Sequence, residues 1–108
     1  MTVVRTICIA GATAQVETRI AAILDEPGRL EARWALGDHA SADLLVVDSE
    51  SVSGHMDWLR AKSAARRVVV CTSQPDAHAG DRCLRKPLLA TQVVALLNEV
   101  GRELAAPS

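Results

Sequence analysis

Three polar residues able to take part in phosphoryl or ion-pair chemistry stand at the ends of apolar segments. Asp48 closes the run Asp43-Leu44-Leu45-Val46-Val47-Asp48, Thr72 follows the run 68–71, and Lys86 follows Leu84-Arg85. The carboxyl ends of parallel strands meet at one edge of an open α/β sheet, where ligands bind. We therefore expect the carboxylate, the hydroxyl and the ammonium to converge. Transfer of a phosphoryl group to that carboxylate would need a cation, normally Mg²⁺, to offset the repulsion between negative charges.

The apolar pattern predicts the strands that would position these residues. Continuous apolar runs are typical of buried parallel strands, whereas strict alternation indicates a half-exposed edge strand. We predict buried strands at 3–10, 44–47 and 68–71, an edge strand at 30–36 and a short last strand at 81–84.

Apolar residues at helical spacing predict helices in the segments between some of these strands and after the last one. Thr13 can cap a first helix that ends before Pro27-Gly28, and Ser53 can cap a second helix. The apolar residues at helical spacing are Val16, Ile20, Ile23 and Leu24 in the first, Met56, Trp58 and Leu59 in the second, and Val93, Val94, Leu97, Val100 and Leu104 in the last, which spans 91–104. Alternating strands and helices predict an α/β fold with a doubly wound, parallel, five-stranded sheet. We expect one domain over 1–104, with 105–108 as a tail or the start of a linker.

Two of the connections between strands are too short for an ordinary helix. They cover 37–42 and 73–80, whereas a parallel crossover usually takes a dozen or more residues. We expect loops at both places, and therefore an apolar sheet face left partly bare. A bare face of that kind usually marks an interface between proteins.

Composition excludes several classes of function. The formal net charge is −1, so no basic field attracts nucleic acid, and no apolar run approaches the ~20 residues of a membrane span. The cysteines have no paired spacing, which is typical of reduced thiols in a cytoplasmic protein. The spacing of His39, His55 and His78 fits no metal-ligand pattern. The chain also lacks the glycine-rich signatures of nucleotide-binding loops, although a signalling nucleotide bound elsewhere stays an open question.

In this order and setting, Asp48, Thr72 and Lys86-Pro87 resemble the receiver domain of bacterial response regulators. The resemblance implies a flavodoxin-like topology in which Asp48 corresponds to the phosphoacceptor and Thr72, Lys86 and Pro87 to the switch residues. Receivers carry helices at the two short connections, so the second and fourth helices are expected to be shortened or absent. Receivers also carry an acidic pair just after the first strand, where this chain has Ala10-Gly11.

Ala10 and Gly11 supply no side-chain oxygen to a metal ion, so we expect Asp48 to form an ion pair with Lys86. The sequence thus predicts a pseudo-receiver of a bacterial two-component system, a cytoplasmic module without catalytic residues, metal or cofactor. It would act by binding a signalling protein whose identity the sequence does not give, and we also expect a homodimer. The contact surface would be the sheet face that lacks helices, or the last strand and last helix.

Two alternatives stay open. The first is a conventional receiver that accepts a phosphoryl group on Asp48. The second is a phosphocysteine carrier, because the segment 8–13, Cys-Ile-Ala-Gly-Ala-Thr, weakly resembles the phosphocysteine loop of the B components of sugar phosphotransferase systems. A thiolate before a helix N-terminus would have a lowered pKa and a cradle for phosphate.

Overall fold

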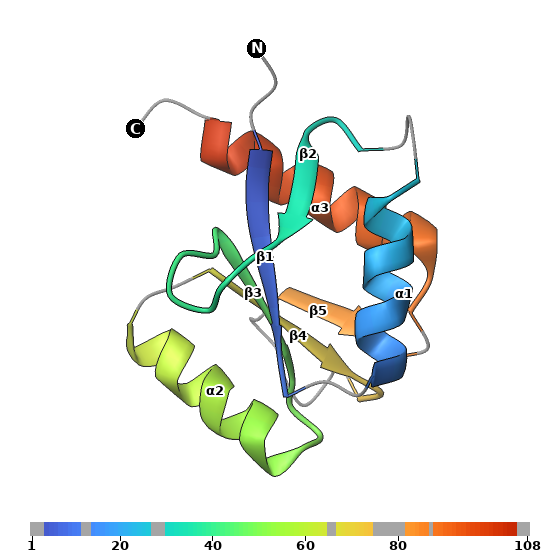
Figure 1. Ribbon diagram of the computed structural model, residues 1–108. Helices are drawn as coiled ribbons and strands as arrows, with labels where there is room; N and C mark the ends of the chain where they lie inside the picture. The colour runs from blue at the N-terminus through green and yellow to red at the C-terminus, as the bar shows by residue number, and fades with distance from the viewer. Residues whose placement is uncertain are drawn as a thin grey trace.

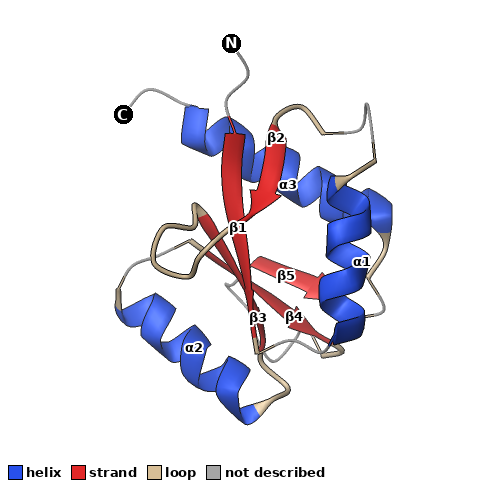
Figure 2. Ribbon diagram, in the orientation of Figure 1, coloured by secondary structure: helices blue, strands red, loops and turns tan. Residues whose placement is uncertain are grey.

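The computed structural model describes residues 4–11, 14–26, 30–64, 67–74, 82–86 and 88–105. The elements in chain order are β1 (Val4–Ala10), α1 (Ala14–Leu24), β2 (Arg33–Leu36), β3 (Leu44–Asp48), α2 (Val52–Ser63), β4 (Val68–Thr72), β5 (Arg82–Arg85) and α3 (Ala90–Ala105) (Figure 1). The strands form one parallel sheet in the order β2-β1-β3-β4-β5 (Figure 2). The predicted α/β class with five parallel strands is confirmed, and the strand order is compatible with a flavodoxin-like fold.

The helices cover the two faces of the sheet unequally. On one face, α1 and α3 enclose the larger core, in which Ile20, Ile23, Val93 and Leu97 pack with Leu44, Val46 and Val69. Among the described helices, α2 is the one on the other face, with Ala61 packed beside Leu45 (Figure 1). None of the described helices has both the length and the apolar character needed to cross a membrane.

The connection between β2 and β3 contains a turn and no helix. The backbone amides of Ser41 and Ala42 both donate to the carbonyl oxygen of Asp38, at 3.3 and 3.0 Å. Asp43 then ties the connection to the sheet, because its Oδ2 accepts a hydrogen bond of 2.9 Å from the amide of Thr6. The residues 75–81, on which the expected loss of a further helix falls, lie outside the described part of the chain.

The expectation of a bare apolar sheet face is wrong for the central strands. Val47 and Val70 occupy adjacent register positions on the α2 side, and both are fully buried. The turn before β3 contributes to this, since Ala42 joins the small core of Leu45 and Ala61. The large exposed apolar side chains of this side lie instead on the outer face of α2.

The predicted cap of the second helix is also wrong. Ser51, with extended backbone angles, precedes α2, and its Oγ accepts a hydrogen bond of 3.0 Å from the amide of Gly54. Ser53 lies inside the helix and is exposed. Thr13 and Pro27-Gly28, which were expected to bound α1, lie outside the described residues.

Candidate functional site

The carboxyl ends of three neighbouring strands bring Asp48, Thr72 and Lys86 to one edge of the sheet. Asp48 pairs in register with Cys71, and Thr72 pairs with Arg85. The amide of Lys86 donates a hydrogen bond of 3.0 Å to the carbonyl oxygen of Thr72, which extends the ladder by one residue.

Asp48 is a buried carboxylate engaged through both oxygens. Its side chain is only 4% exposed, and its Oδ2 lies 2.6 Å from Nζ of Lys86. Its Oδ1 accepts a hydrogen bond of 3.0 Å from the amide of Glu50. The ion pair between Asp48 and Lys86 expected from the sequence is therefore present.

Glu50 is a member of this cluster that the sequence analysis missed. Its Oε1 lies 3.2 Å from Nζ of Lys86 and accepts a hydrogen bond of 2.8 Å from the amide of Ser73. Its Oε2 accepts a second bond, of 3.0 Å, from the hydroxyl of Ser73. The lysine thus bridges a buried and a half-exposed carboxylate. The only sequence signal was an acid two residues after the strand-ending Asp48.

The electrostatics of the cluster favour its charged form. Burial acts to lower the pKa of Lys86, but hydrogen bonds to Asp48 and Glu50 and their negative charges outweigh it, so the pKa is raised. The pKa of Glu50 is lowered, chiefly by the hydrogen bonds from Ser73 and then by Lys86. Because the pKa of Lys86 is raised on folding, its contribution to stability is complete at neutral pH and is lost only as the pH rises through that value.

Gly11 packs so closely on the first turn of α2 that no side chain fits there. Its φ is 68°, in the region that favours glycine, and its carbonyl oxygen accepts a hydrogen bond of 2.8 Å from the hydroxyl of Ser51. A Cβ at Gly11 would lie 2.5 Å from the amide nitrogen of Gly54. An acid at this position would therefore displace α2, and the residues present do not fit a receiver-type Mg²⁺ site.

Within the described residues, the side chains of the other predicted site residues make no hydrogen bond or ion pair with Asp48, Glu50 or Lys86. The buried hydroxyl of Thr72 accepts a hydrogen bond of 3.0 Å from the amide of Gln74, which terminates β4. Ala10 is the half-buried last residue of β1, and Pro87 lies outside the described residues. Within the described part of the chain, no group of three or more His, Cys, Asp or Glu side chains is placed to hold a metal ion.

The cysteines occupy strands. Cys8 lies within β1, in register with Leu45, whereas α1 begins only at Ala14. Cys71 is buried in β4, and burial is the main reason that its pKa is raised to about 12, with the charge of Asp48 adding to the effect. Neither position has the setting of an activated thiolate.

We expect alkylation of the native protein with iodoacetamide to leave Cys71 unmodified. Thiolates are the reactive form, and the thiol of Cys71 stays protonated at ordinary pH. Cys8 should react no faster than Cys83, since both are half-buried in strands. Peptide mass spectrometry over time checks both statements, with the unfolded protein as the control in which all three react alike. Rapid selective labelling of Cys8 would contradict this prediction and favour a phosphocysteine loop.

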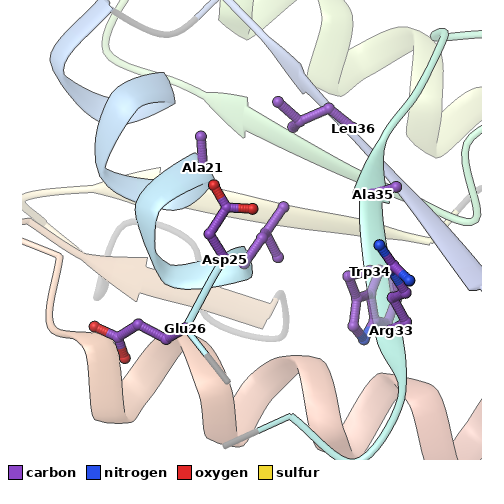
Figure 3. A pocket seen from close by; sticks show the side chains of 8 residues that line it. Ala21, Asp25, Glu26, Arg33, Trp34, Ala35 and Leu36 are labelled. Atoms are coloured by element: carbon purple, nitrogen blue, oxygen red, sulfur yellow. The ribbon is translucent and has the colours of Figure 1, made fainter. Parts of the chain in front are cut away.

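A hollow of about 490 Å³ lies beside the outer strand β2, between that strand and the end of α1. Figure 3 shows Ala21 of α1 and Asp25, just after the end of that helix, on one side of it and Leu36 of β2 on the other. None of the residues that line this hollow belongs to the Asp48 cluster. The hollow and the cluster are therefore separate features.

Comparisons with protein-family models, with curated proteins and with solved structures each gave no match.

Proposed function

We propose that the chain is an atypical receiver-like signalling module that binds a protein partner and is not regulated by phosphorylation of Asp48. The strand order β2-β1-β3-β4-β5 is that of flavodoxin-like sheets, which supports this topology. The turn at 37–43 stands where a receiver has its second helix. We also propose that the fourth helix of the receiver topology is shortened or absent and that the protein is cytoplasmic.

The observation that carries the proposal is the position of Lys86. Its ammonium lies 2.6 Å from Oδ2 of Asp48 and 3.2 Å from Glu50, in the space that a metal ion and a phosphoryl group would need. Mg²⁺ requires oxygen ligands in near-octahedral geometry. Gly11 supplies none, and the contact with Gly54 leaves no room to add one. Both carboxylate oxygens of Asp48 are already engaged, one by Lys86 and one by the amide of Glu50, so an incoming phosphoryl group would have to displace one of these contacts.

A conventional phospho-accepting receiver is the second candidate. It is favoured by one observation, namely that Asp48, Thr72 and Lys86 end three adjacent parallel strands at the same edge. It would require Lys86 to leave Asp48. The phosphocysteine carrier has no comparable support, because Cys8 lies inside β1 rather than before α1.

Incubation with acetyl phosphate and Mg²⁺, followed by intact-mass spectrometry, tests the proposal. We expect the wild-type protein to show no stable phosphoryl adduct, because Asp48 is held by Lys86. Asp48→Asn serves as the matched control for adducts on other side chains. An adduct on the wild type that is absent from Asp48→Asn would contradict the proposal and support the conventional receiver. Partner proteins captured from a bacterial lysate should be the same for wild type and Asp48→Asn.

A further inference from the structure

The outer edge of β2 is an open row of backbone groups. Among the described strands, β2 lies at the end of the sheet and pairs with β1 alone. The amide of Gly37 donates a hydrogen bond of 2.9 Å to the carbonyl oxygen of Ile7 in β1. Because backbone groups alternate in direction along a strand, those of Trp34 and Leu36 face away from β1. No described residue bonds to them at that edge. An open edge of this kind is a template for a further strand.

The hollow of about 490 Å³ follows this open edge, and we call it the β2 groove. All four residues of β2 line it, although their side chains alternate between the two faces of the sheet, and no residue of β1 does. The end of α1 forms the other wall. In Figure 3, Ala21 lies across from Leu36, and Asp25 lies across from Trp34. The volume is within the range of about 300–1,000 Å³ that is usual for ligand sites.

The β2 groove is acidic where α1 ends. Asp25 and Glu26 line it there, and both are exposed. Asp25 has no ion-pair partner among the described residues. The third charged residue of the lining, Arg33, precedes Trp34 in β2. Because Trp34 is buried in the core beneath α1 and α3, Arg33 points to the opposite face of the sheet. The α1 side of the groove therefore combines apolar surface with negative charge.

A second copy of the chain does not fit this edge by symmetric antiparallel pairing of β2 with β2. Paired strands lie about 4.8 Å apart, whereas a helix with its side chains is about 10 Å wide. Symmetric pairing would place both α1 helices on the same face of the joined sheet. Since α1 forms a wall of the groove beside the edge, the two helices would collide. A single extended segment brings no helix of its own.

We propose that an extended segment of a partner protein binds in the β2 groove as an additional strand antiparallel to β2. Antiparallel pairing is the more stable arrangement. The segment carries an apolar side chain opposite Leu36 and, two residues later, a lysine or arginine opposite Trp34 that reaches Asp25. The spacing follows from the period of two along a strand, which turns both side chains to the α1 side.

This inference rests on the proposed function, because it takes the ligand to be a segment of a protein partner. The site itself involves β2 and the end of α1 and does not involve Asp48. The acetyl phosphate experiment and a peptide-binding experiment can therefore fail independently of each other.

The probe is a capped peptide of threonines that carries one valine and, two residues after it, one lysine. Titration into the ¹⁵N-labelled protein, followed by NMR, should shift the amide signals of Trp34 and Leu36. For so small a contact we expect a Kd between about 10 µM and about 1 mM. The same peptide N-methylated at the valine and the lysine cannot donate to β2 and should bind about ten-fold more weakly. Equal affinity of the two peptides, or no binding at all, overturns the proposal.

A charge exchange tests the assignment of Asp25. Replacing the peptide's lysine with glutamate should weaken binding to the wild type by about three-fold. Asp25→Lys should reverse this preference, so that the glutamate peptide binds more tightly. Glu17→Lys makes the same change in the first turn of α1, outside the lining of the groove, and should keep the preference of the wild type. The wild-type preference in Asp25→Lys would overturn the register proposed here.

Leu36→Pro tests the open edge from the side of the protein. It removes an amide that faces away from β1, so the hydrogen bonds between β1 and β2 stay in place. We expect the circular dichroism spectrum of the wild type and at least about ten-fold weaker binding of the lysine peptide. Unchanged binding would contradict the proposal. Self-association of the wild type that Leu36→Pro abolishes would also contradict it, since the edge would then belong to a second copy.

Discussion

Replacing Lys86 with methionine is expected to lower the free energy of unfolding by about 3–5 kcal/mol at neutral pH, the cost of leaving a buried charge without its partner. Asp48 is 4% exposed on its side chain, and Lys86 is the cation that its Oδ2 contacts. The aliphatic part of the lysine is retained by methionine, so the loss reports the charge. Urea unfolding of both proteins followed by circular dichroism measures the difference.

Removing the negative partner of the ion pair by Asp48→Asn should lower the free energy of unfolding by less. In Asp48→Asn, Lys86 keeps its contact with Glu50 and its side chain is 25% exposed, so water can solvate the charge. Lys62→Met is the control for removing an exposed lysine, whose contact with Trp58 is worth about 1 kcal/mol or less. Equal losses in Lys86→Met and Lys62→Met would mean that the ion pair contributes nothing to the fold.

The pH dependence gives a second readout of the same pair. The pKa of Lys86 is raised in the folded protein, so its stabilising effect persists at neutral pH and disappears as the pH rises through that value. The difference between wild type and Lys86→Met should therefore shrink in strongly alkaline solution. A difference that is constant up to the alkaline limit would assign the loss to packing rather than to charge.

The features that the sequence predicts correctly are those that depend on continuous runs of apolar residues. The apolar runs of β3 and β4 identify central parallel strands, and residues at their ends must then lie at a common edge. That reasoning was sufficient to place Asp48 beside Lys86. It did not identify Glu50, because the contact with Lys86 and Ser73 depends on the shape of the turn after β3.

Other errors have the same origin in short-range backbone geometry. Ser51 and Ser53 both precede the apolar residues of α2, and only the extended conformation at Ser51 decides which serine is the cap. The sheet face was expected to be bare because the connection at 37–42 is too short for a helix, but the turn in that connection buries Ala42 beside Leu45 and Ala61. Glycine contacts are likewise invisible in a single sequence, although they fix how β1 and β3 meet α2.

Gly54→Ala is expected to destabilise the protein by more than about 3 kcal/mol, a value reached only when a core feature is disrupted. A Cβ at Gly54 would lie 2.7 Å from the carbonyl carbon of Asp48 and 2.8 Å from Oγ of Ser51. Both the backbone and the capping hydroxyl would have to move. In an exposed helix, by contrast, alanine is favoured over glycine by about 1 kcal/mol.

Gly101→Ala supplies the matched control, because it is the same substitution within helix α3. The nearest atom to a Cβ there belongs to Trp34, at 4.0 Å, which is an ordinary contact. We therefore expect opposite signs, with Gly101→Ala neutral or stabilising by up to about 1 kcal/mol. Thermal unfolding of the three proteins under one condition measures this. If Gly54→Ala were as stable as Gly101→Ala, α2 would not be clamped against the end of β3. The contact with Gly54 would then no longer exclude a side chain at Gly11, and the steric argument against an acidic metal site beside Asp48 would fail.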